Sequence, residues 1–286
     1  MRYFQTRDGD RRLLADDGDA VHDLTAATPR LDSFGTLARS AAVADRSLDA
    51  IARRHLDDAP TVTIDPAGAA VPVDAGEVWA AGVTYEISQE ARESESESPD
   101  VYIQVYESER PELFLKATPS RTVGPGDDVG VRGDSTWDVP EPELGVVLYD
   151  GDIVGYTVGN DVSSRSIEGE NPLYLPQAKV YDRSCAIGPC VASTDSVDDP
   201  HDLVMEMTIE RDGDTVYEGA TSTGDMVRTC EELAGYLDRH NQLPELAVLL
   251  TGTALVPEEG FTLRPGDRVS IDIEEIGTLV NGVRTV

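Results

Sequence analysis

The chain has 286 residues, enough for one large domain or for a catalytic domain with a small extra one. Its 55 acidic side chains outnumber 23 basic ones, and this formal net charge of −32 argues against binding nucleic acid or an anionic membrane through a basic surface. No apolar run approaches the roughly 20 residues that span a bilayer, and the start of the chain does not resemble a signal peptide, so we expect a cytoplasmic protein.

The acidic composition is typical of a folded protein adapted to high salt. Disorder is not expected, because 40% of the residues are hydrophobic. Concentrated salt screens the repulsion between surface carboxylates over a few ångströms. Among the basic residues only Lys116 and Lys179 are lysines. A lysine retained in such a chain is expected to do what arginine cannot, because an ammonium can give up its proton whereas a guanidinium stays charged.

The first 70 residues differ from the rest in their pattern of apolar residues. Apolar residues at three- and four-residue spacing predict one or two amphipathic helices, and they are Leu37, Ala41, Ala44, Leu48 and Ile51. A β-like segment at 61–64 and a linker of small residues at 66–70 follow. We therefore expect a small N-terminal α/β domain over residues 1–70 and a second domain over 71–286.

From Val78 onward the chain consists of short apolar runs separated by Asp-Gly and Pro-Gly turns, which predicts many short strands. Hairpin turns are expected at 149–152 and 211–214. One helix is expected from about Asp225 to Arg239, capped by Asp225 or Thr223. Much strand and few helices indicate a β-rich α+β fold, a sandwich or roll, not a doubly wound sheet.

Two further features of the sequence do not indicate a specific reaction. Residues 92–100 are acidic and low in complexity, typical of a surface loop that could cover a site. The three cysteines, Cys185, Cys190 and Cys230, form no Cys-x-x-Cys pair. We expect them to be reduced packing residues, since neither zinc binding nor a disulfide framework suits this pattern.

Paired acidic residues give the first indication of chemistry. Glu141 and Glu143 stand two apart at the start of an apolar strand, so their side chains leave the same face. Adjacent carboxylates repel unless a cation lies between them, and oxygen ligands suit Mg²⁺, Mn²⁺ or Ca²⁺. Asp161 ends the next apolar strand and could complete the site. The alternative is a chance pair of exposed glutamates, with Asp161 in a turn or helix cap.

Several short motifs follow in a fixed order: Phe114-x-Lys116, Gly124-Pro125-Gly126-Asp127, Glu141-x-Glu143, Asn160-Asp161-Val162-Ser163, Lys179-x-x-Asp182 and Thr251-Gly252-Thr253. Over about residues 78–286 this series resembles the catalytic domain of the fumarylacetoacetate hydrolase superfamily. The resemblance implies a mixed β-sandwich roll and a homodimer or homotetramer. It also implies a divalent metal, usually Mg²⁺, held by Glu141, Glu143 and Asp161, with Lys179 in the substrate site. Arg165 and Asp182 are expected to support the metal ligands.

The hydrolytic branch of this superfamily typically has the motif Asn-Tyr-x-x-His-x-x-Glu, whose His–Glu pair activates water. Here Tyr85 aligns with the tyrosine, but Ser88 and Ala91 replace the pair, and Glu90 is one residue out of register. Without a general base, attack by water loses a factor of about 10²–10⁴. The segments 110–116 and 170–179 instead resemble the branch that dehydrates 2-keto-3-deoxypentonates derived from arabinonate or xylonate.

The expected reaction is Mg²⁺-dependent conversion of such a sugar acid into 2,5-dioxopentanoate and water, in oxidative pentose degradation. Elimination needs a base and an acid. We expect Lys179, with its pKa lowered by burial, to remove a C3 proton, and Glu112 to protonate the leaving C4 hydroxyl. The two roles could be exchanged. Lys116, Thr253 and Tyr85 are the expected substrate contacts.

Less specific interpretations of these residues stay open. Lys179 could be a counter-ion for the carboxylates, Glu112 a surface glutamate, Lys116 a structural residue and Thr253 a turn residue. An acylpyruvate hydrolase or oxaloacetate decarboxylase on the same scaffold is the alternative enzyme. A non-catalytic acidic interaction protein is the alternative from another class, and it would keep its function in Lys179→Met.

Overall fold

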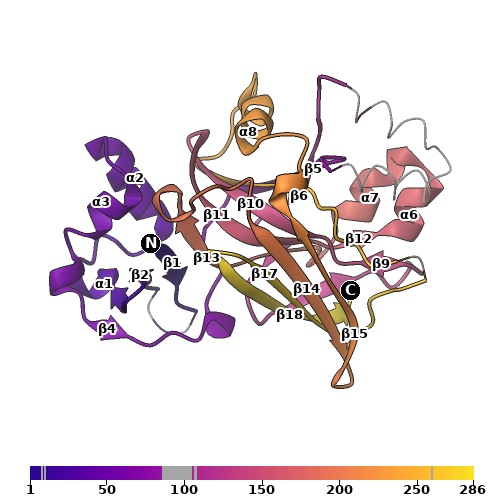
Figure 1. Ribbon diagram of the computed structural model, residues 1–286, viewed down its shortest axis with the longest axis horizontal. Helices are drawn as coiled ribbons and strands as arrows, with labels where there is room; N and C mark the ends of the chain where they lie inside the picture. Colours follow the sequence, from indigo (N-terminus) through magenta and orange to yellow (C-terminus); the bar gives the residue numbers. More distant parts are fainter. Residues whose placement is uncertain (8, 10, 86–104, 106–107, 259) are drawn as a thin grey trace.

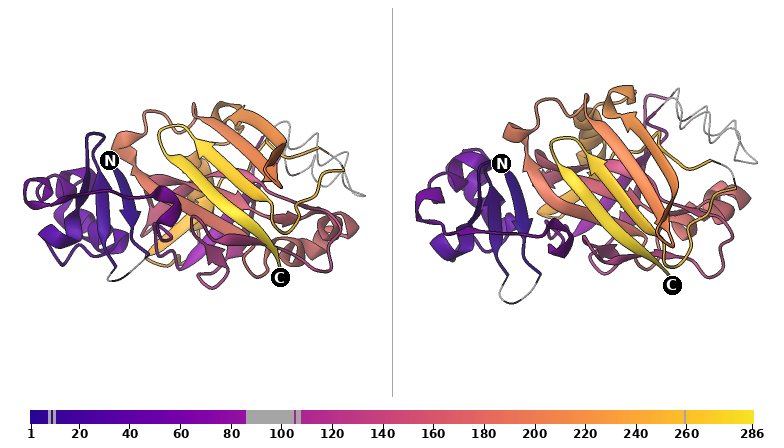
Figure 2. Two further views of the ribbon diagram at one scale, coloured as in Figure 1. Left: turned by 90° about the horizontal axis from the view of Figure 1, so that it is seen from below. Right: turned by 60° about the horizontal axis from the view of Figure 1, so that its bottom comes forward.

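The computed structural model describes residues 1–7, 9, 11–85, 105, 108–258 and 260–286. Within these ranges two β-sheets pack face to face, and short helices lie around them (Figures 1 and 2). This arrangement confirms the predicted β-rich α+β class. The acidic segment 92–100 and the positions Ser88, Glu90 and Ala91 lie outside the described residues.

The larger sheet is mixed and curls back on itself. Its edge strand β6 (Glu112–Ala117) leads into β7 (Thr122–Val123), which pairs with β13 in the middle of the same sheet. The strand order is β4 (Thr61–Val62), β3 (Val21–Asp23), β2 (Leu13–Asp16), β1 (Arg2–Gln5), β13 (Cys185–Ser193), β11 (Asp152–Asp161), β10 (Pro142–Tyr149), β16 (Leu246–Leu250), β5 (Glu77–Gly82), β6.

The second sheet covers one face of the first. Its order is β15 (Asp214–Ser222), β14 (Val204–Arg211), β17 (Arg268–Ile273), β18 (Gly277–Thr285), β8 (Asp128–Val131). Strand β10 is buried on both faces, because it lies in the middle of the sandwich. Its Leu144, Val146 and Leu148 pack toward the second sheet in one core, whereas Val147 belongs to a second core inside the curl.

The N-terminal unit closes one end of the curled sheet. Helix α2 (Phe34–Ala44) begins at a Ser33 capping box, and α3 (Leu48–Ala52) follows, which confirms the predicted amphipathic helices. Phe34 and Leu37 join the core inside the curl. Because β1 pairs with β13, this unit continues the large sheet. The domain boundary at residue 70 stays a prediction; a 3₁₀ turn, η2 (Pro66–Gly68), lies beside it.

Both predicted hairpin turns are confirmed. Asp150 and Gly151 take positive φ angles between β10 and β11, as do Asp212 and Gly213 between β14 and β15, which is the geometry of a tight two-residue hairpin. The three cysteines are buried and free, as expected. No described helix is long and apolar enough to cross a bilayer.

The predicted helix over 225–239 is shorter than expected. Helix α8 spans Cys230–Asp238 and begins at Thr229, whose side chain accepts from the Glu232 N–H. The predicted caps lie outside it, in the 3₁₀ turn η5 (Thr223–Asp225). The helix starts late because the Val227 N–H donates to the Thr84 carbonyl, so the backbone there is bound to the segment after β5.

Three short helical segments were not predicted. They are α6 (Arg165–Glu170), η3 (Pro172–Tyr174) and α7 (Leu175–Lys179), each too short to show an apolar period. A small ribbon of β9 (Asp138–Val139) and β12 (Ser163–Ser164) precedes them. Figure 1 places α6 and α7 at the end of the molecule opposite the N-terminal unit.

Candidate active site

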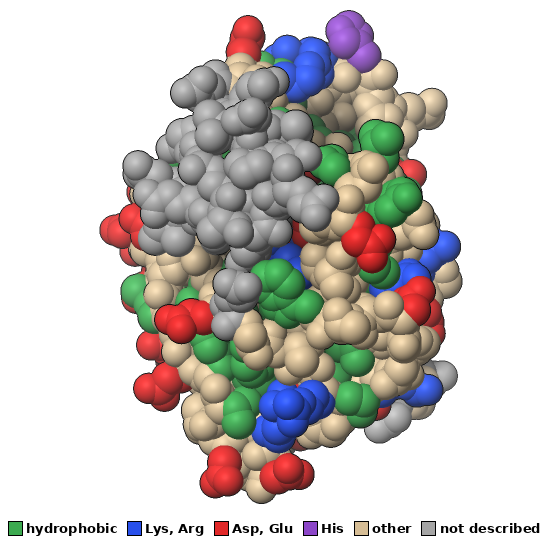
Figure 3. Space-filling model, turned by 90° about the vertical axis from the view of Figure 1, so that its right-hand side faces the viewer, with side chains coloured by type: hydrophobic (Ala, Val, Ile, Leu, Met, Phe, Trp, Pro, Cys, Tyr) green, Lys and Arg blue, Asp and Glu red, His purple; other side chains and the backbone are tan. Residues whose placement is uncertain are grey.

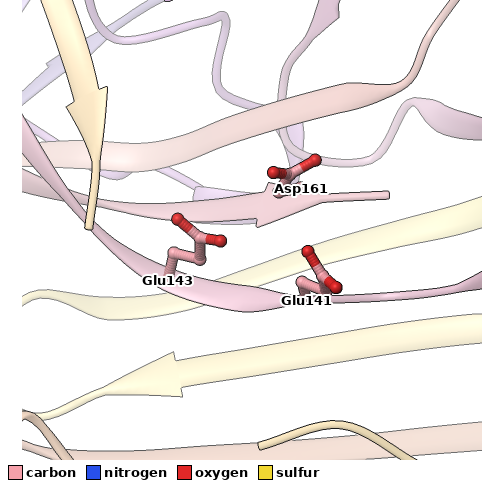
Figure 4. A group of neighbouring side chains, drawn as sticks. All are labelled: Glu141, Glu143 and Asp161. Atoms are coloured by element: carbon pink, nitrogen blue, oxygen red, sulfur yellow. The ribbon is translucent and has the colours of Figure 1, made fainter. Parts of the chain in front are cut away.

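Three carboxylates converge where β10 begins and β11 ends. The Asp161 N–H donates to the Glu141 carbonyl, and Glu143 pairs with Gly159, so the three side chains leave the same face of the sheet. One oxygen from each of Glu141, Glu143 and Asp161 lies within 4.8 Å of the other two (Figure 4). All three are at most 2% exposed. The structure thus brings together the residues that the sequence predicted as metal ligands.

The electrostatics of this group favour a bound cation. Burial raises the pKa of the Glu143 carboxyl well above its ordinary value, and the neighbouring Asp161 and Glu141 charges raise it further. Three buried carboxylates therefore resist joint ionisation unless positive charge lies among them. A set of carboxylate oxygens from two neighbouring strand ends fits a hard cation such as Mg²⁺.

Three basic side chains contact two of these carboxylates, Glu141 and Asp161. Lys116 Nζ is 2.5 Å from Asp161 Oδ1, Arg165 Nη2 is 2.8 Å from Glu141 Oε1, and Lys179 Nζ forms an ion pair with Glu141 Oε2. All three are at most 6% exposed. The expected support of a metal ligand by Arg165 is therefore present, whereas Asp182 is exposed. In formal charge the three carboxylates are balanced by the three basic groups, but these ion pairs reach Glu141 and Asp161 and not Glu143.

Lys179 lies at the centre of this network, as the last residue of α7. Its Nζ lies 3.4 Å from Asp161 Oδ2 and donates to Ser163 Oγ at 2.6 Å. The same nitrogen lies 5.7 Å from the centre of the Phe114 ring. Ser163 also donates to Glu141 Oε2 at 3.0 Å. The sequence marked Ser163 only as part of a motif, because a hydroxyl has no spacing pattern of its own.

Gly252 hydrogen-bonds the third carboxylate, that of Glu143. Its N–H donates to Glu143 Oε2 at 2.7 Å, and its φ of +83° is one that L side chains rarely adopt. A Cβ there would come within 2.1 Å of Thr84 Oγ1. The next residue, Thr253, is buried beside this contact, and its hydroxyl accepts from the Leu255 N–H. That bond is what a turn residue would make, which was the alternative interpretation of Thr253. A contact between Thr253 and the substrate stays a prediction.

Glu112 and Tyr85 border the same region. On β6, Glu112 and Phe114 share one face of the strand, and a β-bulge follows at Lys116, which has no partner residue on β5 in the register of the two strands. The Glu112 carboxylate folds over Gly82, where a Cβ would meet its Oε2 at 2.0 Å. Glu112 also lines a cavity of about 470 Å³ beside η3 and α7. Tyr85 is fully buried, and burial together with the nearby Glu143 charge raises the pKa of its hydroxyl. Their catalytic and substrate-binding roles stay predictions.

We predict that Mg²⁺ binding releases protons and strengthens as pH rises. The raised pKa of Glu143 means that this carboxyl keeps its proton above the usual range, and a metal can bind only after the proton leaves. Titration calorimetry in two buffers of different ionisation enthalpy measures the protons released. An affinity that does not rise with pH over the range in which the protein stays folded, with no proton release, would contradict this electrostatic description.

The comparisons with known proteins agree with this geometry. The family model for the fumarylacetoacetate (FAA) hydrolase C-terminal domain matches residues 77–284. A "Probable 2-keto-3-deoxyxylonate dehydratase" of Haloferax volcanii is 62% identical over the whole of both chains. A 2-dehydro-3-deoxy-D-arabinonate dehydratase of Saccharolobus solfataricus is 44% identical over 74% of this chain and 73% of its own.

A solved structure is similar over the whole length. It is a 2-keto-3-deoxy-D-arabinonate dehydratase complexed with magnesium and 2,5-dioxopentanoate, and it covers 100% of this chain and 99% of its own with a TM-score of 0.85 and 35% identity. The family model, these relatives and the buried carboxylate site lead to one conclusion. The chain belongs to the fumarylacetoacetate hydrolase family.

Proposed function

We propose that this protein is a Mg²⁺-dependent hydro-lyase that converts a 2-keto-3-deoxypentonate into 2,5-dioxopentanoate and water. The observation that carries the choice of reaction is the 62% identity, over both whole chains, to the dehydratase-type Haloferax volcanii protein. The solved dehydratase with magnesium and 2,5-dioxopentanoate supports the same cofactor and product. The buried group of Glu141, Glu143 and Asp161 supplies the oxygen ligands that this cofactor needs.

The site supplies the groups that an elimination requires. Bound Mg²⁺ would polarise the 2-keto group and so make the C3 protons acidic. Lys179 Nζ, held among Glu141, Asp161 and Ser163, is the group that we assign to C3 proton removal. It acts as the base in its neutral form, and a bound Mg²⁺ beside it would favour loss of the ammonium proton. Glu112, at the outer end of the same face of β6, is the group that we assign to protonation of the leaving C4 hydroxyl. Lys179 lies on α7, and both α7 and Glu112 border one cavity.

The product requires further proton transfers after water leaves. Loss of the C3 proton and the C4 hydroxyl gives a 3,4-unsaturated acid with a C5 alcohol. Removal of a C5 proton and return of a proton to C3 give the C4–C5 enol, and protonation at C4 gives the C5 aldehyde. The net change is loss of one water, with no oxidant or reductant. A pair of proton-transfer groups such as Lys179 and Glu112 suffices for this sequence.

We further propose that the protein works in concentrated salt as a homo-oligomer in the cytoplasm. The formal charge of −32 and the scarcity of lysine support the salt adaptation. Figure 3 shows acidic side chains spread mostly round the rim of one face, with hydrophobic side chains nearer its middle. Such carboxylates repel one another less when salt screens them.

The proposed function predicts a specific product from a specific substrate. Purified protein in molar KCl with Mg²⁺ is offered 2-keto-3-deoxypentonates of both C4 configurations, with acylpyruvates in parallel, and the products are identified by NMR. We expect Mg²⁺-dependent 2,5-dioxopentanoate, lost in Glu143→Gln because a ligand is removed. The preferred configuration at C4 shows whether the substrate comes from the D or the L series of pentoses. If the protein releases pyruvate from an acylpyruvate and leaves both sugar acids unchanged, the dehydratase assignment is wrong and the hydrolase alternative holds.

The assignment of base and acid predicts different partial reactions. In D₂O, Lys179→Met should abolish exchange of the substrate C3 protons and lower kcat by about 10²–10⁴. Glu112→Gln should keep C3 exchange while it loses most water elimination, because only the leaving group lacks its proton donor. NMR of the recovered substrate measures the exchange. If Glu112→Gln abolishes C3 exchange and Lys179→Met keeps it, the two roles are exchanged. Full activity in Glu112→Gln would show that Glu112 takes no part in the reaction.

A further inference from the structure

Lys116 is a buried lysine whose ammonium is surrounded by three oxygens. Its side chain is 0% exposed. The Nζ lies 2.5 Å from Asp161 Oδ1, donates to the Val162 carbonyl at 2.9 Å, and donates to the main-chain carbonyl of Lys179. An ammonium has three N–H donors. Two of them are used by the carbonyls, and the nitrogen is in addition ion-paired with Asp161, so no exposed side of the ammonium is left for a substrate.

The three oxygens belong to parts of the fold that are far apart in the sequence. Lys116 lies on the edge strand β6, Asp161 and Val162 are at the end of β11, and Lys179 ends α7. The last carbonyls of a helix have no partner within the helix. A helix of five residues is also too short to be stable alone. The ammonium of Lys116 thus ties the end of α7 to the strand that carries a metal ligand.

We propose that Lys116 is a positioning residue for the metal ligand Asp161 and for Lys179, in place of the substrate contact expected from the sequence. Through Asp161 Oδ1 it orients one carboxylate of the metal site. Through the Lys179 carbonyl it fixes the backbone from which the Lys179 ammonium reaches Glu141. The inference rests on the proposed function only for the role of Lys179 in proton transfer.

Arginine could not take this place. The three oxygens surround one nitrogen, which suits a compact ammonium, whereas a guanidinium is a planar fork whose donors point along fixed directions. The Tyr181 ring lies 5.9 Å from the same nitrogen and limits the space for a larger group. This geometry gives a physical reason why lysine stands at position 116 in a chain that otherwise uses arginine.

Metal affinity distinguishes a positioning role of Lys116 from simple charge balance, because the two roles predict opposite changes in affinity when Lys116 is removed. If Lys116 only balanced charge, its removal would strengthen cation binding to the carboxylates. If it positions Asp161, its removal weakens binding, and loss of a group that orients a ligand typically costs 10–100-fold in metal affinity. Lys179→Met is the matched control, since it removes the other lysine ammonium from the same carboxylates.

The experiment measures Mn²⁺ binding to the intact protein by electron paramagnetic resonance in molar KCl, without substrate. We expect Lys116→Gln to weaken binding by about 10-fold or more, and Lys179→Met not to weaken it. At saturating Mg²⁺, Lys116→Gln should lower kcat with little change in KM. Unchanged or tighter Mn²⁺ binding in folded Lys116→Gln would overturn the proposal, as would a raised KM with normal metal affinity. The metal readout stands even if the dehydratase assay fails.

A measurement on the unsubstituted protein covers the case in which Lys116→Gln does not fold. With only two lysines, labelling with ¹³C at lysine Cε gives two signals, and Lys179→Met assigns them. Pyruvate added to the Mg²⁺-loaded protein, as a 2-keto acid probe, should shift the Lys179 signal and leave the Lys116 signal unchanged. A shift of the Lys116 signal as large as that of Lys179 would restore the substrate contact and overturn the proposal.

Discussion

Three carboxylates buried side by side cannot all ionise without positive charge among them, and the functional end of this molecule is built around that constraint. Burial raises the pKa of Glu143, and the two neighbouring acids raise it further. Lys116 contacts Asp161, Arg165 contacts Glu141 and Lys179 contacts both, so three basic groups balance the formal charge of the three acids. A divalent cation would add net positive charge, which a 2-keto acid substrate, as an anion, would offset. Metal and substrate binding are thus coupled through electrostatics.

The fold makes this site possible by curling one sheet. The ends of β10 and β11 place Glu141, Glu143 and Asp161 on one face, and the curl brings the edge strand β6 back over them. The second sheet covers the opposite face of β10, and the N-terminal unit closes the other end of the curl. The short helices α6 and α7 then deliver Arg165 and Lys179. Strands thus supply the three carboxylates, and the short helices supply two of the three basic side chains.

Much of this arrangement could be predicted from the sequence, for identifiable physical reasons. A spacing of two residues on a strand placed Glu141 and Glu143 on one face, and Asp-Gly turns marked the hairpins. The motif series added Asp161 and Lys179. Helices α6 and α7 could not be predicted, since neither is long enough for an apolar period, and α8 was predicted too long because its first turns are bound elsewhere. The three oxygens around the Lys116 ammonium come from distant segments, so only the folded chain shows that this nitrogen is enclosed by protein.

The central claim is that the site starts an elimination by removing a proton from C3, and the fate of the C5 hydrogens tests it most directly. A 2-keto-3-deoxypentonate that carries deuterium at C5 is converted with Mg²⁺ in H₂O, and the 2,5-dioxopentanoate is examined by NMR after a short incubation. The account predicts that one C5 deuteron is lost to solvent and that C4 carries hydrogen from water. Transfer of that deuteron from C5 to C4 would instead show a 1,2-hydride shift across the C4–C5 diol. That result would contradict a reaction that begins at C3.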